Sequence, residues 1–295
     1  MRTFGDGRAL AIVNPAAGGG RGERRLRELV RIFKAAGGRV DIARTPAEGE
    51  ATRLARDAAR DGYARVIVVG GDGTLNEVAN GIVGTDVSLA VVPMGTANDF
   101  ARALGVPKWR EAARLAVQGT TRPIDAALVN GRVIANCVGV GLDAAGVSVA
   151  SRHKRIVGPF AYFTAAVQTI ATFRPLQLRL TLDGEVVEGP RLLVVASNTE
   201  RFANGMRIAP GAVVNDGLLD VCIVGDTPVP VTLVLLAKVY RGTHVGHPKV
   251  RMARVRELLI EQPRVLPVEL DGELMRADRV EVRCVPGALA VVTPG

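Results

Sequence analysis

Residues 66–77 constrain the fold most strongly, because a buried strand pattern runs there directly into glycines and a helix pattern. The stretch reads Val-Ile-Val-Val-Gly-Gly-Asp-Gly-Thr-Leu-Asn-Glu. Glycines let a backbone approach a ligand closely, and the first N–H groups of a helix are free to bind an anion. We expect phosphate to bind between this strand and a helix over 74–83. A ligand-free turn is the alternative, but Thr74, Asn76 and Glu77 exceed what a turn needs.

The first 121 residues alternate strand and helix patterns. Strand patterns occupy residues 10–13, 39–43, 66–69 and 88–92. Small and polar residues follow three of these strands, and the carboxyl ends of parallel strands share one sheet edge. We therefore expect an α/β nucleotide-binding domain over residues 1–121, with three turns facing one cleft.

The second helix of this domain has a sequence signal for its start. Thr45 is predicted to cap the N-terminus, Pro46 to stand at the first helical position, and Glu48 to complete a capping box. The helix should then continue to about Asp61.

From Arg122 onward, strand patterns follow one another without amphipathic helices between them. Residues 176–182 alternate apolar and polar side chains, and Asp183-Gly184 supplies a hairpin turn. Further strand patterns occupy 191–197, 218–224, 258–261, 266–270, 279–285 and 288–292. We expect a β-rich antiparallel sandwich over residues 122–295, and its last strand is a candidate to return to the first domain.

The charge of the chain favours an anionic partner. Lys and Arg number 38 against 29 Asp and Glu, so the formal net charge is +9. A nucleotide, a nucleic acid or an anionic membrane surface would fit, as would a solvated Arg-rich surface. No interleaving of basic and aromatic residues points to nucleic acid.

Cysteine usage and the N-terminus indicate a cytoplasmic protein. Cys137, Cys222 and Cys284 are odd in number and lie in apolar runs, so we expect reduced core residues. Residues 1–8 carry no apolar stretch of the kind found in a signal peptide.

One uncharged stretch over residues 156–173 needs separate treatment. Its glycine, proline and threonines fit an interior or interfacial helix better than a membrane-spanning one. The basic residues Arg152, Lys154 and Arg155 precede it, and such a cluster suits an anionic membrane surface. A core helix with a solvated basic end explains the pattern equally well.

The sequence does not match three common motifs for nucleotide or metal binding. Gly18-Gly19-Gly20 is followed by Arg21-Gly22-Glu23, which lacks the Gly-Lys and hydroxyl residue of a Walker A loop. No Gly-x-Gly-x-x-Gly joins a strand to a helix as in a Rossmann fold, and the three histidines form no zinc pattern.

Five motifs together carry a family resemblance. They are Asn14-Pro15 with Gly18, residues 70–77, residues 93–102 as Pro-Met-Gly-Thr-Ala-Asn-Asp-Phe-Ala-Arg, residues 215–220 as Asn-Asp-Gly-Leu-Leu-Asp, and Asp271-Gly272-Glu273. The chain resembles, over nearly its whole length, the diacylglycerol kinase catalytic-domain family, which includes bacterial lipid kinases, sphingosine kinases and ceramide kinases. Ala97 replaces a glycine found in many relatives.

The resemblance implies transfer of the ATP γ-phosphoryl group to a lipid hydroxyl in a cleft between an NAD kinase/diacylglycerol kinase-like domain and a β-rich domain. It implies that Asp72 and Asp99 organise a catalytic Mg²⁺, partly through water. The residues that it assigns to ATP binding are Asn14, Pro15, Gly18, Thr45, Gly71, Asp72, Gly73, Thr74, Leu75, Asn76, Glu77, Thr96 and Asn98.

The resemblance also assigns two Asp-Gly turns. Asp216, with the backbone carbonyls of Val213 and Leu218, would bind a second, structural Mg²⁺. Asp271 would be the general base with Glu273 beside it, although which of the two is the base stays open. The chain holds six Asp-Gly pairs, so the dipeptide alone predicts only a turn.

The leading interpretation is therefore an ATP- and Mg²⁺-dependent lipid kinase, peripherally associated with a membrane, with diacylglycerol as the leading acceptor. Phosphatidylglycerol and sphingoid bases remain open as acceptors. An NAD kinase-like enzyme and a catalytically silent binding module are the alternatives. A homodimer is a candidate assembly.

Overall fold

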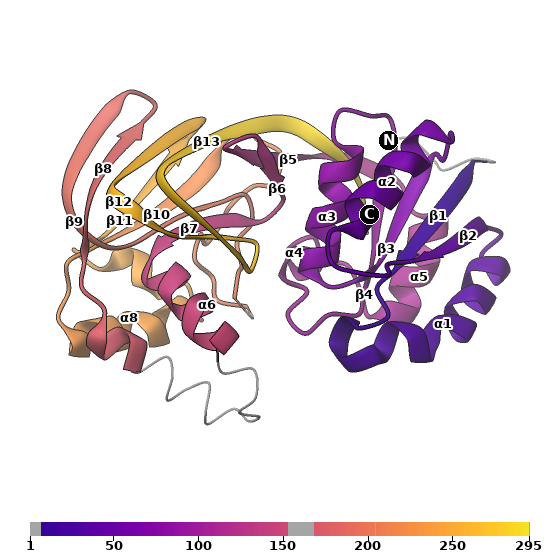
Figure 1. The fold of residues 1–295 in the computed structure, drawn as a ribbon, viewed down its shortest axis with the longest axis horizontal. Helices are drawn as coiled ribbons and strands as arrows, with labels where there is room; N and C mark the ends of the chain where they lie inside the picture. The colour runs from indigo at the N-terminus through magenta and orange to yellow at the C-terminus, as the bar shows by residue number, and fades with distance from the viewer. Residues whose placement is uncertain (1–6, 153–167, 204, 295) are drawn as a thin grey trace.

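The computed structural model describes residues 7–152, 168–203 and 205–294. Two lobes lie side by side along the long axis, the N-terminal one at the right of Figure 1. Within the described residues, thirteen strands form one hydrogen-bonded network that runs through both lobes.

A parallel sheet forms the centre of the N-terminal lobe. Its strands are β1 (Arg8–Val13), β2 (Arg39–Arg44), β3 (Arg65–Gly70) and β4 (Ser88–Pro93). They lie in the order β4, β3, β1, β2, and each pair is parallel. The carboxyl ends of all four strands therefore share one edge, as the sequence predicts.

Helices cover both faces of this sheet. Leu29 and Phe33 of α1 (Ala17–Ala35) and Ala113 of α5 (Trp109–Gln118) pack with one set of strand residues. The opposite face is covered by α2 (Glu50–Arg60), α3 (Asp72–Ile82) and α4 (Asp99–Ala103). Alternate residues of each strand enter opposite cores because side chains alternate across a sheet.

Two helix starts differ from the prediction. The α2 helix begins at Glu50, not near Thr45, and its cap residue Gly49 has φ 85°. The Ala51 N–H donates to the Glu77 carboxylate at 2.9 Å, so a side chain from α3 satisfies the helix end that the local capping box was expected to satisfy. The α3 helix begins at Asp72, two residues before the expected Thr74.

Antiparallel strands form the second lobe. They are β5 (Thr121–Val129), β6 (Arg132–Ile134), β7 (Cys137–Gly141), β8 (Leu176–Leu182), β9 (Glu185–Ser197), β10 (Leu219–Gly225), β11 (Val250–Val255), β12 (Glu257–Leu270) and β13 (Glu273–Val292). Their inward side chains form one aliphatic core. The predicted fold class, an α/β domain followed by an antiparallel β-rich domain, is confirmed.

The second lobe is not purely β-structure. Among the described residues, α6 (Leu142–Arg152), α8 (Val229–Val239), the 3₁₀ turn η1 (Thr243–Gly246) and a helical stretch over 168–172 lie between its strands. The sequence predicts a helix in this lobe only over 156–173. The α8 helix is apolar on most of its surface, so it lacks the polar stripe by which an amphipathic helix is recognised.

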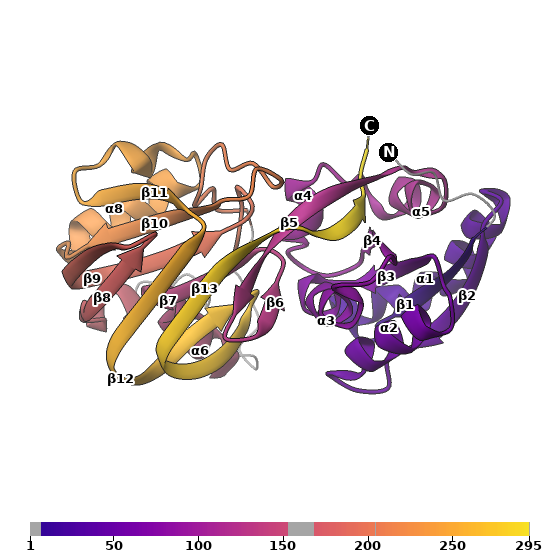
Figure 2. The same ribbon diagram turned by 90° about the horizontal axis from the view of Figure 1, so that it is seen from above.

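Two long strands join the lobes. Val291 of β13 pairs in parallel with Leu89 of β4, and β5 pairs with β13 along most of its length. Figure 2 shows both strands running from one lobe to the other. The predicted boundary between residues 121 and 122 falls at the start of β5 and stays a prediction.

The three cysteines are buried and free. Across the part of the chain that the structure describes, no helix is long and apolar enough to cross a membrane. The predicted helix over 156–173 and the basic cluster at 152–155 lie largely outside the described residues.

Candidate active site

Three turns at the carboxyl edge of the parallel sheet meet. The Asn14 side chain, after β1, donates to Thr74 Oγ1 of α3 at 2.9 Å. A methyl group added to Gly71 would lie 3.0 Å from the Gly95 Cα atom, so the turns after β3 and β4 touch through their backbones. The structure thus brings together Asn14, Gly71 and Thr74, which the sequence assigned to one cleft.

Polar side chains fix the shape of these turns. Asn98 has φ 51°, and its side chain accepts a hydrogen bond from the Gly95 N–H at 2.8 Å and donates to the Gly95 carbonyl at 2.9 Å. Arg21 donates to the carbonyls of Gly18 and Gly95, each at 2.9 Å. Arg21 was not predicted as a site residue, although its position directly after three glycines is a usable signal.

The N-terminus of α3 is open. No described side chain caps it, and the first N–H groups of a helix lack intrahelical partners. A methyl group added to Gly73 would meet no atom within 4 Å, so the helix start borders open space there. The Glu77 carboxylate points elsewhere, to the α2 N-terminus, where it holds two helices together.

Two carboxylates, the partly exposed Asp72 and the buried Asp99, stand close to this helix end. Asp72 Oδ1 accepts the Phe100 N–H at 3.3 Å, which fixes its orientation toward α4. Burial raises the pKa of the Asp72 carboxyl, the Phe100 N–H lowers it, and the charge of Asp99 raises it further. Two carboxylates in such proximity repel each other unless a cation or proton lies between them.

Asp271 reaches this region from the second lobe. Its carboxylate accepts N–H groups of Ala135 at 3.0 Å, Asn136 at 3.2 Å and Cys137 at 2.8 Å. Burial raises the pKa of Asp271 to about 7; the three N–H donors oppose this, and the negative charge of Asp72 adds to it. The two carboxylates therefore interact across the lobes.

A side chain bridge holds the two lobes in register at this place. Asn80 of α3 donates to the Val133 carbonyl at 2.6 Å and accepts the Val133 N–H at 2.9 Å. Val133 belongs to β6, which leads directly into the three N–H donors of Asp271. The helix that carries Asp72 is thus tied to the turn that orients Asp271.

Two further acids near Asp271, the buried Glu269 and the partly exposed Asp143, were not predicted from the sequence. Glu269, only 4% exposed, accepts the Gly272 N–H, and Cys137 Sγ lies 3.8 Å from its other oxygen. Burial raises the pKa of Glu269 well above its ordinary value and that of Asp143 to about 6. Glu269 stands between Val268 and Leu270 near the end of β12, and an acid within an apolar strand pattern is the signal that could have revealed it.

Comparison with known proteins agrees with this geometry. Residues 8–129 match the family described as "Diacylglycerol kinase catalytic domain". Residues 136–293 match the family described as "YegS C-terminal NAD kinase beta sandwich-like domain". A diacylglycerol kinase of Bacillus subtilis (strain 168) is 31% identical over 271 residues, which cover 90% of this chain and 89% of that protein. A diacylglycerol kinase of Staphylococcus carnosus (strain TM300) is 32% identical over 270 residues, covering 90% and 88%.

The chain belongs to the diacylglycerol kinase catalytic-domain family. Solved structures agree. One, of a protein from Bacillus anthracis str. Sterne, matches with a TM-score of 0.82 and 28% identity, over 100% of this chain and 98% of that chain. A crystal structure of a diacylglycerol kinase from the same organism has a TM-score of 0.76 at 24% identity, with the same coverage, and supports the fold.

The remaining residues that the resemblance assigned to ATP binding lie at varied depth around the sheet edge. The Thr45 N–H donates to the Val13 carbonyl at 3.0 Å, which places the end of β2 beside that of β1. Thr96 is exposed, and Pro15 is partly exposed between β1 and α1. Leu75 and Asn76 are buried in α3.

Glu273, the second candidate base, is engaged differently from Asp271. Its carboxylate forms an ion pair with Arg132 of β6, and both side chains are partly exposed. The Glu273 carboxylate is thus engaged by a guanidinium, whereas the Asp271 carboxylate accepts backbone N–H groups.

The predicted structural Mg²⁺ site is arranged unexpectedly in this family member. Asp216 Oδ1 accepts the Leu218 N–H at 3.1 Å, and Asp216 Oδ2 is paired with Arg254. Val213 is exposed on the same loop. The Arg254 guanidinium therefore already supplies a positive charge beside Asp216, and a divalent ion does not fit there without displacing it.

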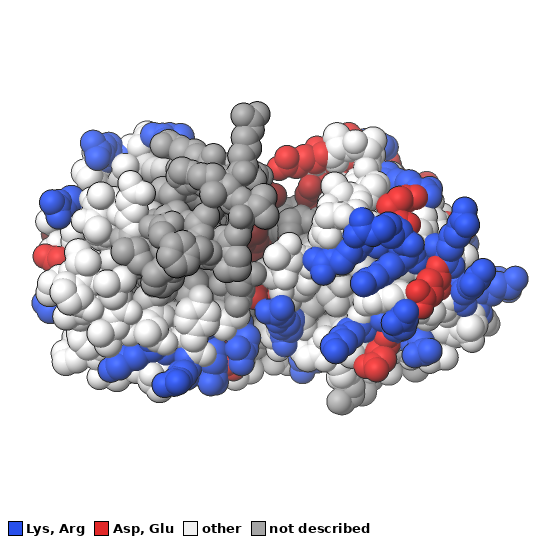
Figure 3. Space-filling view, turned by 90° about the horizontal axis from the view of Figure 1, so that it is seen from below, with Lys and Arg blue, Asp and Glu red and all other residues white. Residues whose placement is uncertain are grey.

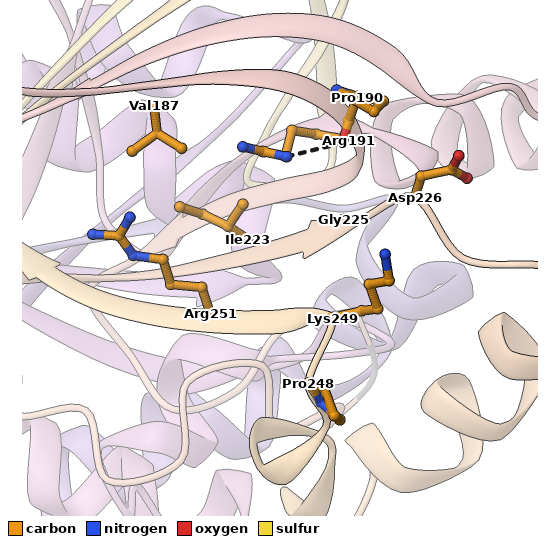
Figure 4. A pocket seen from close by; sticks show the side chains of 9 residues that line it. All are labelled: Val187, Pro190, Arg191, Ile223, Gly225, Asp226, Pro248, Lys249 and Arg251. Carbon is orange, nitrogen blue, oxygen red and sulfur yellow. Dashed lines mark hydrogen bonds between the residues drawn. The ribbon is translucent and has the colours of Figure 1, made fainter.

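Two cavities lie away from the assembled residues. The one in Figure 4, of about 260 Å³, is lined by residues of β9, β10 and β11. Two of its cations are engaged, since Arg251 binds Glu185 and Arg191 donates to the carbonyls of Glu188 and Pro190. The other, of about 550 Å³, lies against the strands around Asp183. Neither contains a predicted site residue.

Proposed function

We propose that this protein transfers the γ-phosphoryl group of ATP to the hydroxyl group of a membrane lipid, with diacylglycerol as the leading acceptor. The observation that carries the proposal is the pair of hydrogen bonds between Asn80 of α3 and Val133 of β6, which ties the helix that begins at Asp72 to the turn whose N–H groups orient Asp271. In this proposal the first lobe binds the ATP phosphates and the second lobe supplies the base, as a reaction between a nucleotide and a second substrate requires.

We propose that the ATP phosphates bind at the α3 N-terminus against Gly71, Gly73 and Thr74. Support comes from the open space at Gly73 and from Asn76, whose Nδ2 is buried without a partner among the described residues. Helix N-terminal N–H groups and close glycine backbones suit phosphate oxygens. The roles proposed for Asn14, Gly18 and Asn98 are to shape this turn, and that of Glu77 is to hold α2 against α3.

Asp72 and Asp99 fit a catalytic Mg²⁺. Mg²⁺ is commonly held by one or two carboxylates together with substrate phosphates, and the repulsion between these two neighbouring acids would be relieved by a cation. When bound, the ion would neutralise charge on the phosphate oxygens. For a second, structural Mg²⁺, the Asp216 loop does not fit, and no role is assigned to it.

Asp271 is proposed as the general base. The acceptor oxygen forms a bond to the γ-phosphorus while the bond from that phosphorus to the ADP oxygen breaks, and the hydroxyl proton passes to Asp271. A base whose pKa lies near 7 is well matched to neutral pH, because it is ionised often enough and still binds a proton. The three N–H donors keep the carboxylate oriented.

A lipid acceptor requires contact with a membrane surface, and we propose peripheral association from the cytoplasmic side. Figure 3 shows Lys and Arg side chains gathered on the face of the N-terminal lobe, and acidic side chains at the hollow between the lobes. Exposed Arg24, Arg27, Arg31 and Lys34 of α1 add positive charge to that lobe. Anionic vesicles should bind better than neutral ones, and salt should weaken this binding. A homodimer stays a prediction.

Two alanine substitutions in one turn test the position of ATP. Gly73→Ala adds a methyl group in open space within a helix, so the variant should melt like the parent yet lose ATP binding and lipid phosphorylation. Gly71→Ala places its methyl group 3.0 Å from the Gly95 backbone, so it should lower the melting temperature. If Gly73→Ala binds ATP and phosphorylates lipid as the parent does, phosphate does not lie at this helix end.

A further inference from the structure

The carboxylate of the Asp216 loop forms an ion pair with a cation of the same chain, Arg254. Arg254 of β11 lies directly opposite Asp220 of β10 in the antiparallel register. From there its Nη2 donates to Asp216 Oδ2, and its Nε lies 3.8 Å from Asp220 Oδ1. One guanidinium therefore stands between two carboxylates, and the strand register holds it there.

Both oxygens of Asp216 are in use. Oδ2 receives Arg254, and Oδ1 receives the Leu218 N–H at 3.1 Å. The Asp216 side chain is 24% exposed, and the residue lies at the surface. A Mg²⁺ ion bound to Oδ2 would lie beside a guanidinium of the same sign, and one bound to Oδ1 would share that oxygen with the Leu218 N–H.

The loop backbone is also held by groups of the protein. Asp125, 2% exposed, accepts the Gly217 N–H at 2.7 Å with one oxygen and the Gly287 N–H at 2.7 Å with the other. Its own N–H donates to the Val214 carbonyl at 2.8 Å. Residues on both sides of Asp216 are thus anchored to Asp125, Val214 by the Asp125 backbone N–H and Gly217 by the buried Asp125 carboxylate.

We propose that Arg254 takes the place of a structural Mg²⁺ at the Asp216 loop, so that the second lobe of this protein is stabilised independently of divalent cations. The positive charge that would otherwise come from a bound ion is covalently attached to β11. The proposal concerns stability and does not depend on the lipid kinase function.

Thermal melting without nucleotide tests the proposal. The parent, Asp216→Ala, Arg254→Gln and Arg251→Gln are each melted in EDTA and in millimolar Mg²⁺. Arg251 is the matched control, because it lies on the same strand and forms an ion pair with Glu185 away from the loop. Any Mg²⁺ effect from the Asp72 region persists in Asp216→Ala, so only a shift that Asp216→Ala abolishes reports on the loop.

The parent should show no Asp216-dependent shift with Mg²⁺. Arg254→Gln should lower the melting temperature by about 2–4 °C, the shift expected from loss of one moderate interaction in a domain of this size, and by more than Arg251→Gln. A Mg²⁺ stabilisation of the parent that Asp216→Ala removes would overturn the proposal. So would an Arg254→Gln variant that melts like Arg251→Gln.

Discussion

Replacing Asp271 by Asn tests whether this carboxylate is the general base. The amide keeps the size of the carboxylate but does not accept a proton from the acceptor hydroxyl. Lipid phosphorylation should fall by about 10²- to 10⁴-fold, the usual scale for loss of a positioned base. ATP affinity should change little, because the direct partners of Asp271 are backbone N–H groups of residues 135–137 in the second lobe.

The substitution also has a structural cost that the hydrogen bonds define. The carboxylate offers two oxygens to three N–H donors, whereas Asn offers one oxygen and an NH₂ group that faces donors. A buried donor without a partner costs about 1–3 kcal/mol. The variant should therefore melt several degrees below the parent, and rates should be measured at a temperature at which both are folded.

The pH dependence of the parent separates the chemical effect from the structural one. Below a pKa of about 7, Asp271 is mostly protonated and cannot act as a base, so the rate should fall about tenfold per pH unit on the acid side. Because the charge of Asp72 raises this pKa, a cation bound at Asp72 should move the inflection to lower pH. Glu273→Gln is the control for the neighbouring acid.

An Asp271→Asn variant that retained a rate within a few-fold of the parent would refute the assignment. A larger loss in Glu273→Gln would move the role of base to that residue, despite its ion pair with Arg132.

Two further predictions concern stability. Arg65, 1% exposed, donates to the carbonyls of Ala116, Val117 and Gly119 at the end of α5. Arg65→Met should therefore lower the free energy of unfolding, measured in urea, by at least about 1–3 kcal/mol. The surface change Arg60→Met should alter it by no more than about 0.5 kcal/mol. Burial raises the pKa of Asp143 to about 6, above its unfolded value. Its ionisation therefore opposes folding, and the free energy of unfolding should fall as pH rises from about 4 to 6. Asp143→Asn should flatten this fall, and an unchanged slope would contradict the assignment.

Local chemistry explains what the sequence predicted well. The turns after β1, β3 and β4 require glycines and polar residues at fixed distances from the strand ends, and residues 14–18, 70–77 and 93–99 carry them. Apolar alternation over 176–182 likewise predicts β8 with its observed bounds. Each of these signals arises within about ten residues of chain.

What the sequence missed depends on distant partners. The α2 helix starts late because its N–H partner, Glu77, lies 26 residues further along the chain. Asp271 owes its orientation to N–H groups more than 130 residues earlier, and no motif announces them. The Arg254 partner of Asp216 follows from the register of β10 against β11, which the pattern of either strand alone does not specify.

The most direct test of the central claim is the fate of the γ-phosphoryl group. Labelled ATP and Mg²⁺ should be mixed with the protein and vesicles that contain diacylglycerol, phosphatidylglycerol or a sphingoid base, with NAD in a parallel reaction, and the products should be separated by thin-layer chromatography. We expect label in an organic-soluble phosphomonoester formed from diacylglycerol, and none in that product with Asp271→Asn. Label transferred to NAD alone, or to no acceptor at all, would contradict the account.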